Sequence, residues 1–142
     1  MNKIIIALLL LIFSNAHSSA LMGIRETDIL VEELREDELK CGLTKDIIDA
    51  SIRLPISNTR IKFNSKADSF LYANVNAIYQ GNYCVFNMRL EFRKYVNSER
   101  DVGAFWRKGQ VAVWERNNVS RRIADEFESY TKQFIAAWLK EN

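Results

Sequence analysis

The chain has two cysteines, Cys41 and Cys84, and their chemistry depends on the compartment in which the protein folds. They lack the C-x-x-C spacing that lowers a thiol pKa, so we do not expect a redox-active pair. In an exported protein the usual outcome is a disulfide, because the compartment outside the cytoplasm is oxidising. Two unpaired thiols or an intermolecular bridge are the alternatives. We predict an intramolecular Cys41–Cys84 bond that stabilises the fold by roughly 4 kcal/mol.

The N-terminal sequence predicts export. It has one positive charge at Lys3, an unbroken apolar run over 4–13, and small residues that end at Ala20. These are the three parts of a secretory signal peptide. We expect residues 1–20 to be cleaved after Ala20, with cleavage after Ser18 as the second choice. A short membrane anchor is the alternative, but this apolar run is about half of the ~20 residues needed to cross a bilayer.

Residues 21–142 are predicted to form a single domain, because no linker, repeat or low-complexity stretch interrupts them. No segment in this range is apolar enough to span a membrane, so we expect a soluble periplasmic or secreted protein. The chain has 20 basic and 18 acidic residues, and cleavage would remove Lys3, which leaves a net charge near +1. This balance does not favour nucleic acid or the bulk membrane surface as a partner.

Residues that commonly carry catalysis are scarce in this domain. The only histidine, His17, lies in the predicted signal peptide, so the mature chain can build neither a histidine-activated nucleophile nor a histidine-containing zinc site. A carboxylate pair of the glycosidase type stays open, because its spacing in space is not visible in sequence. We expect the acidic candidates to be a solvated edge or loop: Glu32, Glu33, Glu36, Asp37 and Glu38. The sequence thus predicts a non-enzymatic protein without a catalytic residue, metal or cofactor.

Charge is unevenly spread along the chain. Acidic residues outnumber basic ones between residues 25 and 40, and basic residues outnumber acidic ones between 89 and 122. Tryptophan and arginine are enriched at binding hot spots. The candidate interaction patch therefore consists of Trp106, Arg107, Lys108, Trp114 and Arg116. The alternatives are that the basic residues lie on the water side of strands and that either tryptophan belongs to the core.

The elements that would position these residues follow a mixed α and β pattern. Residues 27–36 suit either a strand or a helix, and we favour a strand because the next segment has its own helix start. Thr44 is a good N-cap for a short helix that we expect to end at Pro55. Residues 58–64 then read as a strand entered from a turn.

A long antiparallel hairpin is the clearest β pattern in the sequence. Apolar and polar residues alternate over 70–79 and again over 83–96, around a turn at 80–82. Cys84 falls on the apolar face of the second strand. A disulfide there would attach the loop before the first helix to the sheet.

The C-terminal third is predicted to add one strand and a long helix. The strand over 111–115 follows a turn at Lys108–Gly109, and residues 104–107 could pair with it. From Asn118 or Ser120 onward, apolar residues recur every three or four positions, which predicts a terminal helix. The fold class is therefore α+β: a two-layer domain with an antiparallel sheet of four to five strands and both helices packed on one face.

The segments GLTKDIID, LYANV, YCVFNMRLEF and FIAAWLKEN resemble those of small exported bacterial proteins that have no assigned function. The order of strand, short helix, strands and terminal helix is also similar to α+β modules of periplasmic envelope factors, such as the N-terminal domain of TolB and LptE. Unlike LptE, this chain has no lipid-acceptor cysteine after the apolar run. The resemblance implies a periplasmic role and assigns no functional residue.

Two functions follow as expectations. The first is a non-enzymatic accessory protein that binds another envelope protein through the candidate patch or an exposed sheet edge. An open edge could also pair two copies of the chain into a homodimer. The second is a small-ligand-binding or secreted host-directed protein, with a pocket between helix and sheet lined by Tyr72, Tyr79 or Trp114. We prefer the first.

Overall fold

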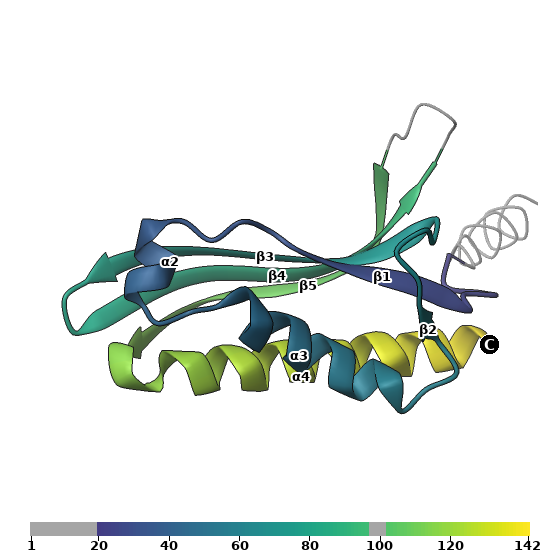
Figure 1. Ribbon diagram of the computed structural model, residues 1–142. Helices are drawn as coiled ribbons and strands as arrows, with labels where there is room; N and C mark the ends of the chain where they lie inside the picture. Colours follow the sequence, from purple (N-terminus) through teal and green to yellow (C-terminus); the bar gives the residue numbers. More distant parts are fainter. Residues whose placement is uncertain (1–19, 97–101) are drawn as a thin grey trace, which may run out of the picture.

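A computed structural model describes residues 20–96 and 102–142. The predicted signal peptide, apart from Ala20, lies outside the described residues. The chain forms two layers, with a five-stranded sheet above the two longer helices (Figure 1). The predicted two-layer α+β architecture is confirmed.

The elements follow one another in a simple order. The first half contains β1 (Glu26–Val31), α2 (Glu36–Lys40), α3 (Lys45–Ser57) and β2 (Lys62–Phe63). The second half contains β3 (Ser69–Gln80), β4 (Tyr83–Tyr95), β5 (Val102–Glu115), the 3₁₀ turn η1 (Arg116–Asn118) and α4 (Val119–Glu141).

The sheet is mixed, whereas the sequence predicted an antiparallel one. Its strand order is β2-β1-β3-β4-β5. β1 runs parallel to both of its neighbours, and the β3–β4 and β4–β5 pairs are antiparallel. The difference arises because the chain leaves β1 through two helices, and a helical crossover returns the next strand in the same direction.

The predicted strand at residues 27–36 is confirmed only in its first part, because β1 ends at Val31 and α2 begins at Glu36. Thr44 caps α3 as predicted, and its hydroxyl accepts the N–H of Ile47 at 3.3 Å. The helix does not end at Pro55 but continues to Ser57.

Side chains supply partners for carbonyls in the last turn of α3. The Ser57 hydroxyl donates to the Arg53 carbonyl at 2.9 Å, and the Asn58 amide donates to the Leu54 carbonyl at 3.4 Å. The predicted strand at residues 58–64 shrinks to the two residues of β2, which pair only with Glu26 and Thr27 of β1.

The β3–β4 hairpin is confirmed. Gly81 forms its turn with a φ of 63°, a backbone conformation that glycine adopts without steric cost. Alternate residues of the two strands face the helices and form the centre of the core: Leu71, Ala73, Val75, Cys84, Phe86, Met88, Leu90 and Phe92.

The predicted turn at Lys108–Gly109 is wrong, because β5 runs unbroken for 14 residues through both positions. Gly109 lies opposite Arg89 of β4. A Cβ atom at Gly109 would lie 2.6 Å from the Met88 carbonyl oxygen. This glycine therefore permits a close approach of two strands, which is a known role of glycine inside a strand.

Helix α4 begins after Asn118, as predicted, and lies under the sheet along almost its whole length (Figure 1). The apolar side of the helix carries the buried residues Val119, Ile123, Phe127, Tyr130, Thr131, Phe134 and Trp138. Phe134 stacks on Phe92 of β4 with ring centroids 5.2 Å apart. Leu139, near the end of the helix, is 57% exposed.

Within residues 20–96 and 102–142, none of the helices combines the length and the apolar character that crossing a membrane requires.

Candidate binding surface

The Cys41–Cys84 bond predicted from the sequence is present. Cys41 follows the last residue of α2, and Cys84 lies on the core face of β4. Both residues are fully buried, and their Cα atoms are 6.2 Å apart. The bond therefore holds α2 against the end of the β3–β4 hairpin.

Both tryptophans of the candidate patch lie on the helix-covered side of the sheet. Trp106 packs edge-on against Phe134 of α4, and Trp114 packs against Phe86, each with ring centroids 5.5 Å apart. Both tryptophans are half-buried and pack against the hydrophobic core. The structure thus agrees with the alternative in which these side chains belong to the core.

The three basic residues of the candidate patch point in different directions. Arg107 lies opposite Glu91 on the face of the sheet away from the helices, whereas Lys108, the next residue of β5, points to the helix side. Arg116 follows the end of β5 and donates from Nε to the Lys40 carbonyl at 2.8 Å. The structure therefore does not gather the five residues into one surface.

We call the sheet surface away from α3 and α4 the open face. An ion cluster occupies its centre, with Glu91 of β4 only 1% exposed. The Glu91 carboxylate lies 2.6 Å from Arg93 Nη2, 2.9 Å from Arg107 Nε and 3.7 Å from Arg89 Nη1. We call these four residues the arginine cluster. One buried carboxylate offsets only one of three cationic charges, so the cluster carries excess positive charge.

Tyr72 extends the arginine cluster towards β1. The guanidinium carbon of Arg93 lies 3.9 Å from the centre of the Tyr72 ring, a cation–π contact. Burial and a hydrogen bond to Glu32 raise the pKa of Tyr72 above its usual value. Its contact with Arg93 places Tyr72 on the open face. Tyr72 is one of the three residues that the ligand-binding alternative named for a pocket between helix and sheet, and it does not lie there.

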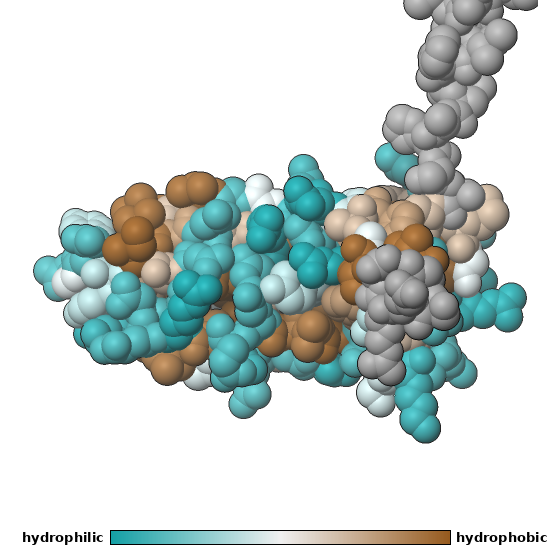
Figure 2. Space-filling model, turned by 90° about the horizontal axis from the view of Figure 1, so that it is seen from above, coloured by the Kyte–Doolittle hydropathy of each residue, from teal (hydrophilic) through white to brown (hydrophobic). Residues whose placement is uncertain are grey.

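Exposed apolar residues cover the hairpin end of the open face. The sheet register places Ile78, Val85 and Val113 side by side, and Val111 lies two residues from Val113 on the same face of β5. We call these four residues the apolar patch. Ile78 is 56% exposed, Val111 71% and Val113 59%. Figure 2 views this face from above and shows hydrophobic residues near the hairpin end, with a hydrophilic band beside them.

The sequence led us to expect that the acidic residues around α2 are solvated. Two of them, Asp37 and Glu38, are not. Glu38 is 2% exposed, and its two carboxylate oxygens accept the N–H groups of Ala77 at 2.6 Å and Arg35 at 2.7 Å. The Asp37 carboxylate accepts the N–H of Tyr79 at 3.2 Å. Glu33 and Glu36 are exposed. Glu38 lies three residues after the N-cap of α2, but that N-cap is Arg35, which lacks the side-chain acceptor of a capping-box sequence, so no sequence signal identified Glu38.

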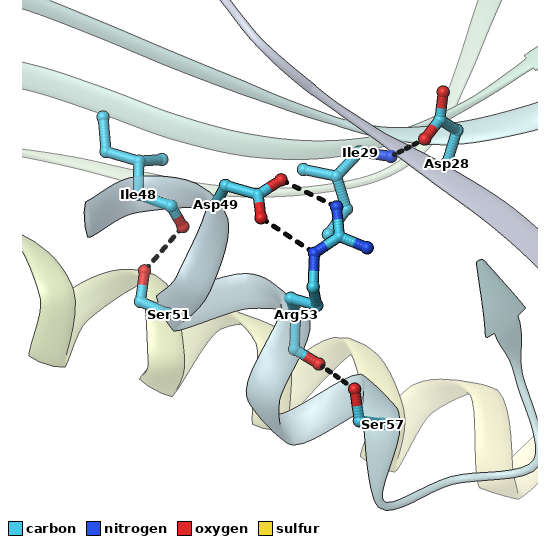
Figure 3. Close-up of polar contacts among 7 residues, drawn as sticks. All are labelled: Asp28, Ile29, Ile48, Asp49, Ser51, Arg53 and Ser57. Atoms are coloured by element: carbon cyan, nitrogen blue, oxygen red, sulfur yellow. Dashed lines mark hydrogen bonds and ion pairs between the residues drawn. The ribbon is translucent and has the colours of Figure 1, made fainter. Parts of the chain in front are cut away.

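The half-buried polar residues of α3 serve the fold. Arg53 donates from Nε and Nη2 to the two oxygens of Asp49, at 2.8 and 2.9 Å (Figure 3). Its guanidinium carbon also lies 4.4 Å from the Phe63 ring centre. The hydrogen bond to Asp49 raises the pKa of Arg53, and Asp28 adds a smaller effect in the same direction. The cation–π contact links α3 to β2.

A hollow of about 600 Å³ opens at the hairpin end, between α2 and the start of α4. Its lining includes Gly42, Tyr83, Arg116 and Ser120, and it does not include Trp114. The space between the two layers is filled by core side chains. Among the described residues, no cluster of three histidine, cysteine, aspartate or glutamate side chains is placed to hold a metal ion.

The function of the chain has to be inferred from its surfaces. No protein-family model matches the sequence, and no curated protein matches it at a significant level.

Proposed function

We propose that the protein is an exported, non-enzymatic accessory protein that binds another envelope protein through the open face of its sheet. The observation that carries the proposal is the apolar patch. Three of its four side chains are more than half exposed, although they project from regular strands. A cluster of exposed apolar side chains rimmed by polar residues is a common mark of a protein-binding surface.

The arginine cluster suggests the chemistry of the partner. The Arg107 side chain is 59% exposed and that of Arg89 40% exposed, so both side chains remain partly accessible beside the apolar patch. A complementary partner would present an apolar surface flanked by carboxylates. That the partner is an envelope protein rests on the resemblance to periplasmic envelope modules and on export.

Two contacts support export with cleavage after Ala20. The buried disulfide requires an oxidising compartment to form. Leu21 is 3% exposed, and its backbone nitrogen lies 2.9 Å from Glu141 Oε2. Cleavage after Ala20 would turn this amide into a charged amino group facing a carboxylate, which strengthens the contact.

Mass spectrometry of the protein recovered from the exporting cell tests the cleavage site. We expect a mature chain that begins at Leu21. A chain that begins at Ser19, or one that keeps residues 1–20, would contradict this part of the proposal.

Site-specific photocrosslinking in the cell tests the binding surface. A photoreactive amino acid at Asn87, an exposed open-face position paired with Val111, should crosslink to a partner. The same amino acid at Gln133, exposed on α4, is the matched position on the other side of the molecule. Crosslinking of equal strength at both positions would overturn the proposal.

Two matched substitutions complete the experiment. Ile78→Glu places a charge in the apolar patch and should abolish the crosslink from Asn87. Leu54→Glu changes a leucine of α3 that is 67% exposed and should leave the crosslink intact. If Ile78→Glu has no more effect than Leu54→Glu, the apolar patch does not bind the partner.

A further inference from the structure

Strand β5 forms one edge of the sheet for its whole length. The register with β4 skips Phe105, because Phe92 pairs with Trp106 and Arg93 pairs with Ala104. From Arg107 to Glu115 the register is regular, and the segment contains no proline. A regular edge strand presents a row of free N–H and C=O groups to which another strand can pair.

The distribution of charge along this segment identifies the strand that fits. The segment begins with Arg107 and Lys108 and ends with Glu115, so its two ends carry opposite charges. Antiparallel pairing with an identical segment brings each basic end to an acidic end. This complementarity favours a second copy of the chain over an unrelated strand.

We propose that two copies of the protein pair antiparallel through β5, with Val111 on the two-fold axis. This register places Arg107 opposite Glu115 of the second copy, and symmetry repeats the contact. Directly opposed residues of an antiparallel pair project to the same face and lie close enough to interact. The two-fold axis therefore creates two ion pairs and one valine–valine contact on the open face.

Side-chain size fits the same register. Val113, which is 59% exposed, comes to lie opposite Gly109 of the second copy, which has no side chain to obstruct it. On the helix side, Lys108 lies opposite Trp114 of the second copy, an arrangement that permits a cation–π contact. Gln110 lies opposite the small Ala112.

Neighbouring registers lose these contacts. A pair centred on Lys108 would place two Lys108 side chains against each other, and like charges directly opposite are destabilising. A pair centred on Gly109 places Arg107 opposite Val111. A pair centred on Ala112 moves Arg107 beyond the end of β5, opposite Asn117 in η1.

The pairing joins the two sheets into one and keeps both open faces on the same side. The apolar patches of the two copies then meet at the axis, so the dimer enlarges the apolar surface assigned to the partner. Arg107 is used by the second copy, and Arg89 stays available to the carboxylates of the partner. An interface limited to one strand is small, and we expect a reversible dimer with a Kd of about micromolar.

Analytical ultracentrifugation of the chain from Leu21 to Asn142 tests the association. The wild-type protein should change from monomer to dimer with concentration. Glu115→Arg should raise the Kd at least tenfold, because it opposes Arg107 with a second cation. Asp46→Arg, an equal charge change at an exposed position of α3, should leave the Kd unchanged. A wild-type protein that is monomeric at about 200 μM would overturn the proposal.

Disulfide trapping tests the register. Val111→Cys places two thiols on the axis, where opposed Cα atoms lie about 4.5–5.5 Å apart, within the range of a disulfide. Oxidation should therefore yield a covalent dimer. Val113→Cys is the control, because its two copies would lie about 14 Å apart. Stronger trapping of Val113→Cys than of Val111→Cys would overturn the register.

One further variant separates this inference from the proposed function. Ile78→Glu lies two strands away from the β5 edge and should leave the dimer intact while it removes the envelope partner. Loss of the dimer in Ile78→Glu would contradict pairing through β5 alone.

Discussion

The β3 side and the β5 side of the central hairpin end in different ways. On the β3 side, β1 pairs with residues Phe70–Ala73 and the backbone N–H of Glu32 donates to the Ala73 carbonyl. Beyond that point the carboxylates of α2 accept the N–H groups of Ala77 and Tyr79. On the β5 side, the described residues supply no further strand next to β5.

This difference shows that a strand edge can be closed without another strand. Two carboxylates on a helix of five residues take the place of a strand's carbonyl groups. The helix is too short to be stable alone, since isolated helices of this length do not form in water. The disulfide at the end of α2 therefore holds the two carboxylates in position. Within residues 20–96 and 102–142, nothing comparable covers β5.

Removal of the disulfide should have the largest effect on stability. It acts on the β3 edge, which β1 and α2 close. We expect Cys41→Ala with Cys84→Ala to lower the free energy of unfolding by roughly 4 kcal/mol, because the unfolded chain gains the entropy of an open loop. Urea denaturation measures the loss. The amide protons of Ala77 and Tyr79 should also exchange faster, since α2 is no longer attached.

The reduced wild-type protein is the matched control for this variant and should show the same loss. A double variant that unfolds at the same urea concentration as the oxidised parent would show that α2 holds its place without the bond.

Replacement of the Glu38 carboxylate should cause the next largest loss of stability. Both of its oxygens accept a backbone N–H, and an amide side chain offers only one acceptor oxygen. Glu38→Gln therefore leaves one buried N–H facing an NH₂ group, and we expect a loss of about 1.5–3 kcal/mol in urea denaturation.

Glu36→Gln is the control on the same helix. Glu36 is exposed and pairs with Lys40 on the surface of the helix, so its removal should cost clearly less than that of Glu38. Equal effects of the two variants would mean that the buried hydrogen bonds do not close the edge.

The features that sequence predicted correctly are those set by periodicity within one element. The alternation around Cys84 assigned it to the core face, and the spacing of apolar residues from Val119 to Trp138 identified the buried side of α4. Such patterns are visible because each residue's direction depends only on its own element.

The features that sequence missed depend on a neighbour distant in the chain. Gly109 was predicted to be a turn residue from its type alone. Its actual role depends on the Met88 carbonyl, which lies beside it on β4. Glu38 resembles a solvated charge until the free amides of β3 are placed beside it. The five residues of the candidate patch do not form one surface, because adjacent residues of a strand, such as Arg107 and Lys108, face opposite sides of the sheet.

Gly109→Ala should have an intermediate effect, on the open edge. The added methyl group would lie 2.6 Å from the Met88 carbonyl oxygen and 2.7 Å from Arg89 Cγ, so β5 must move away from β4. We expect a loss of about 1–3 kcal/mol in thermal or urea unfolding.

Gly103→Ala in the same strand is the control. The nearest atoms to a methyl group there are side-chain atoms of Phe105 and Val96, both at 3.1 Å, and side chains can turn aside. If Gly103→Ala is the more damaging variant, the close approach at Gly109 does not limit the strand pair.

Asp37→Asn should lower the free energy of unfolding least. This variant tests whether burial of the carboxylates or their charge closes the β3 edge. The Asp37 carboxylate is half-buried, accepts one N–H at 3.2 Å, and its asparagine replacement keeps an acceptor oxygen. We expect a loss of about 0.5–1 kcal/mol, with faster amide exchange at Tyr79 and little change at Ala77. This order places Glu38 above Asp37 because desolvation makes the deeper hydrogen bonds more costly to lose. The reverse order would mean that negative charge at α2 closes the edge, and high salt should then open it in the wild-type protein.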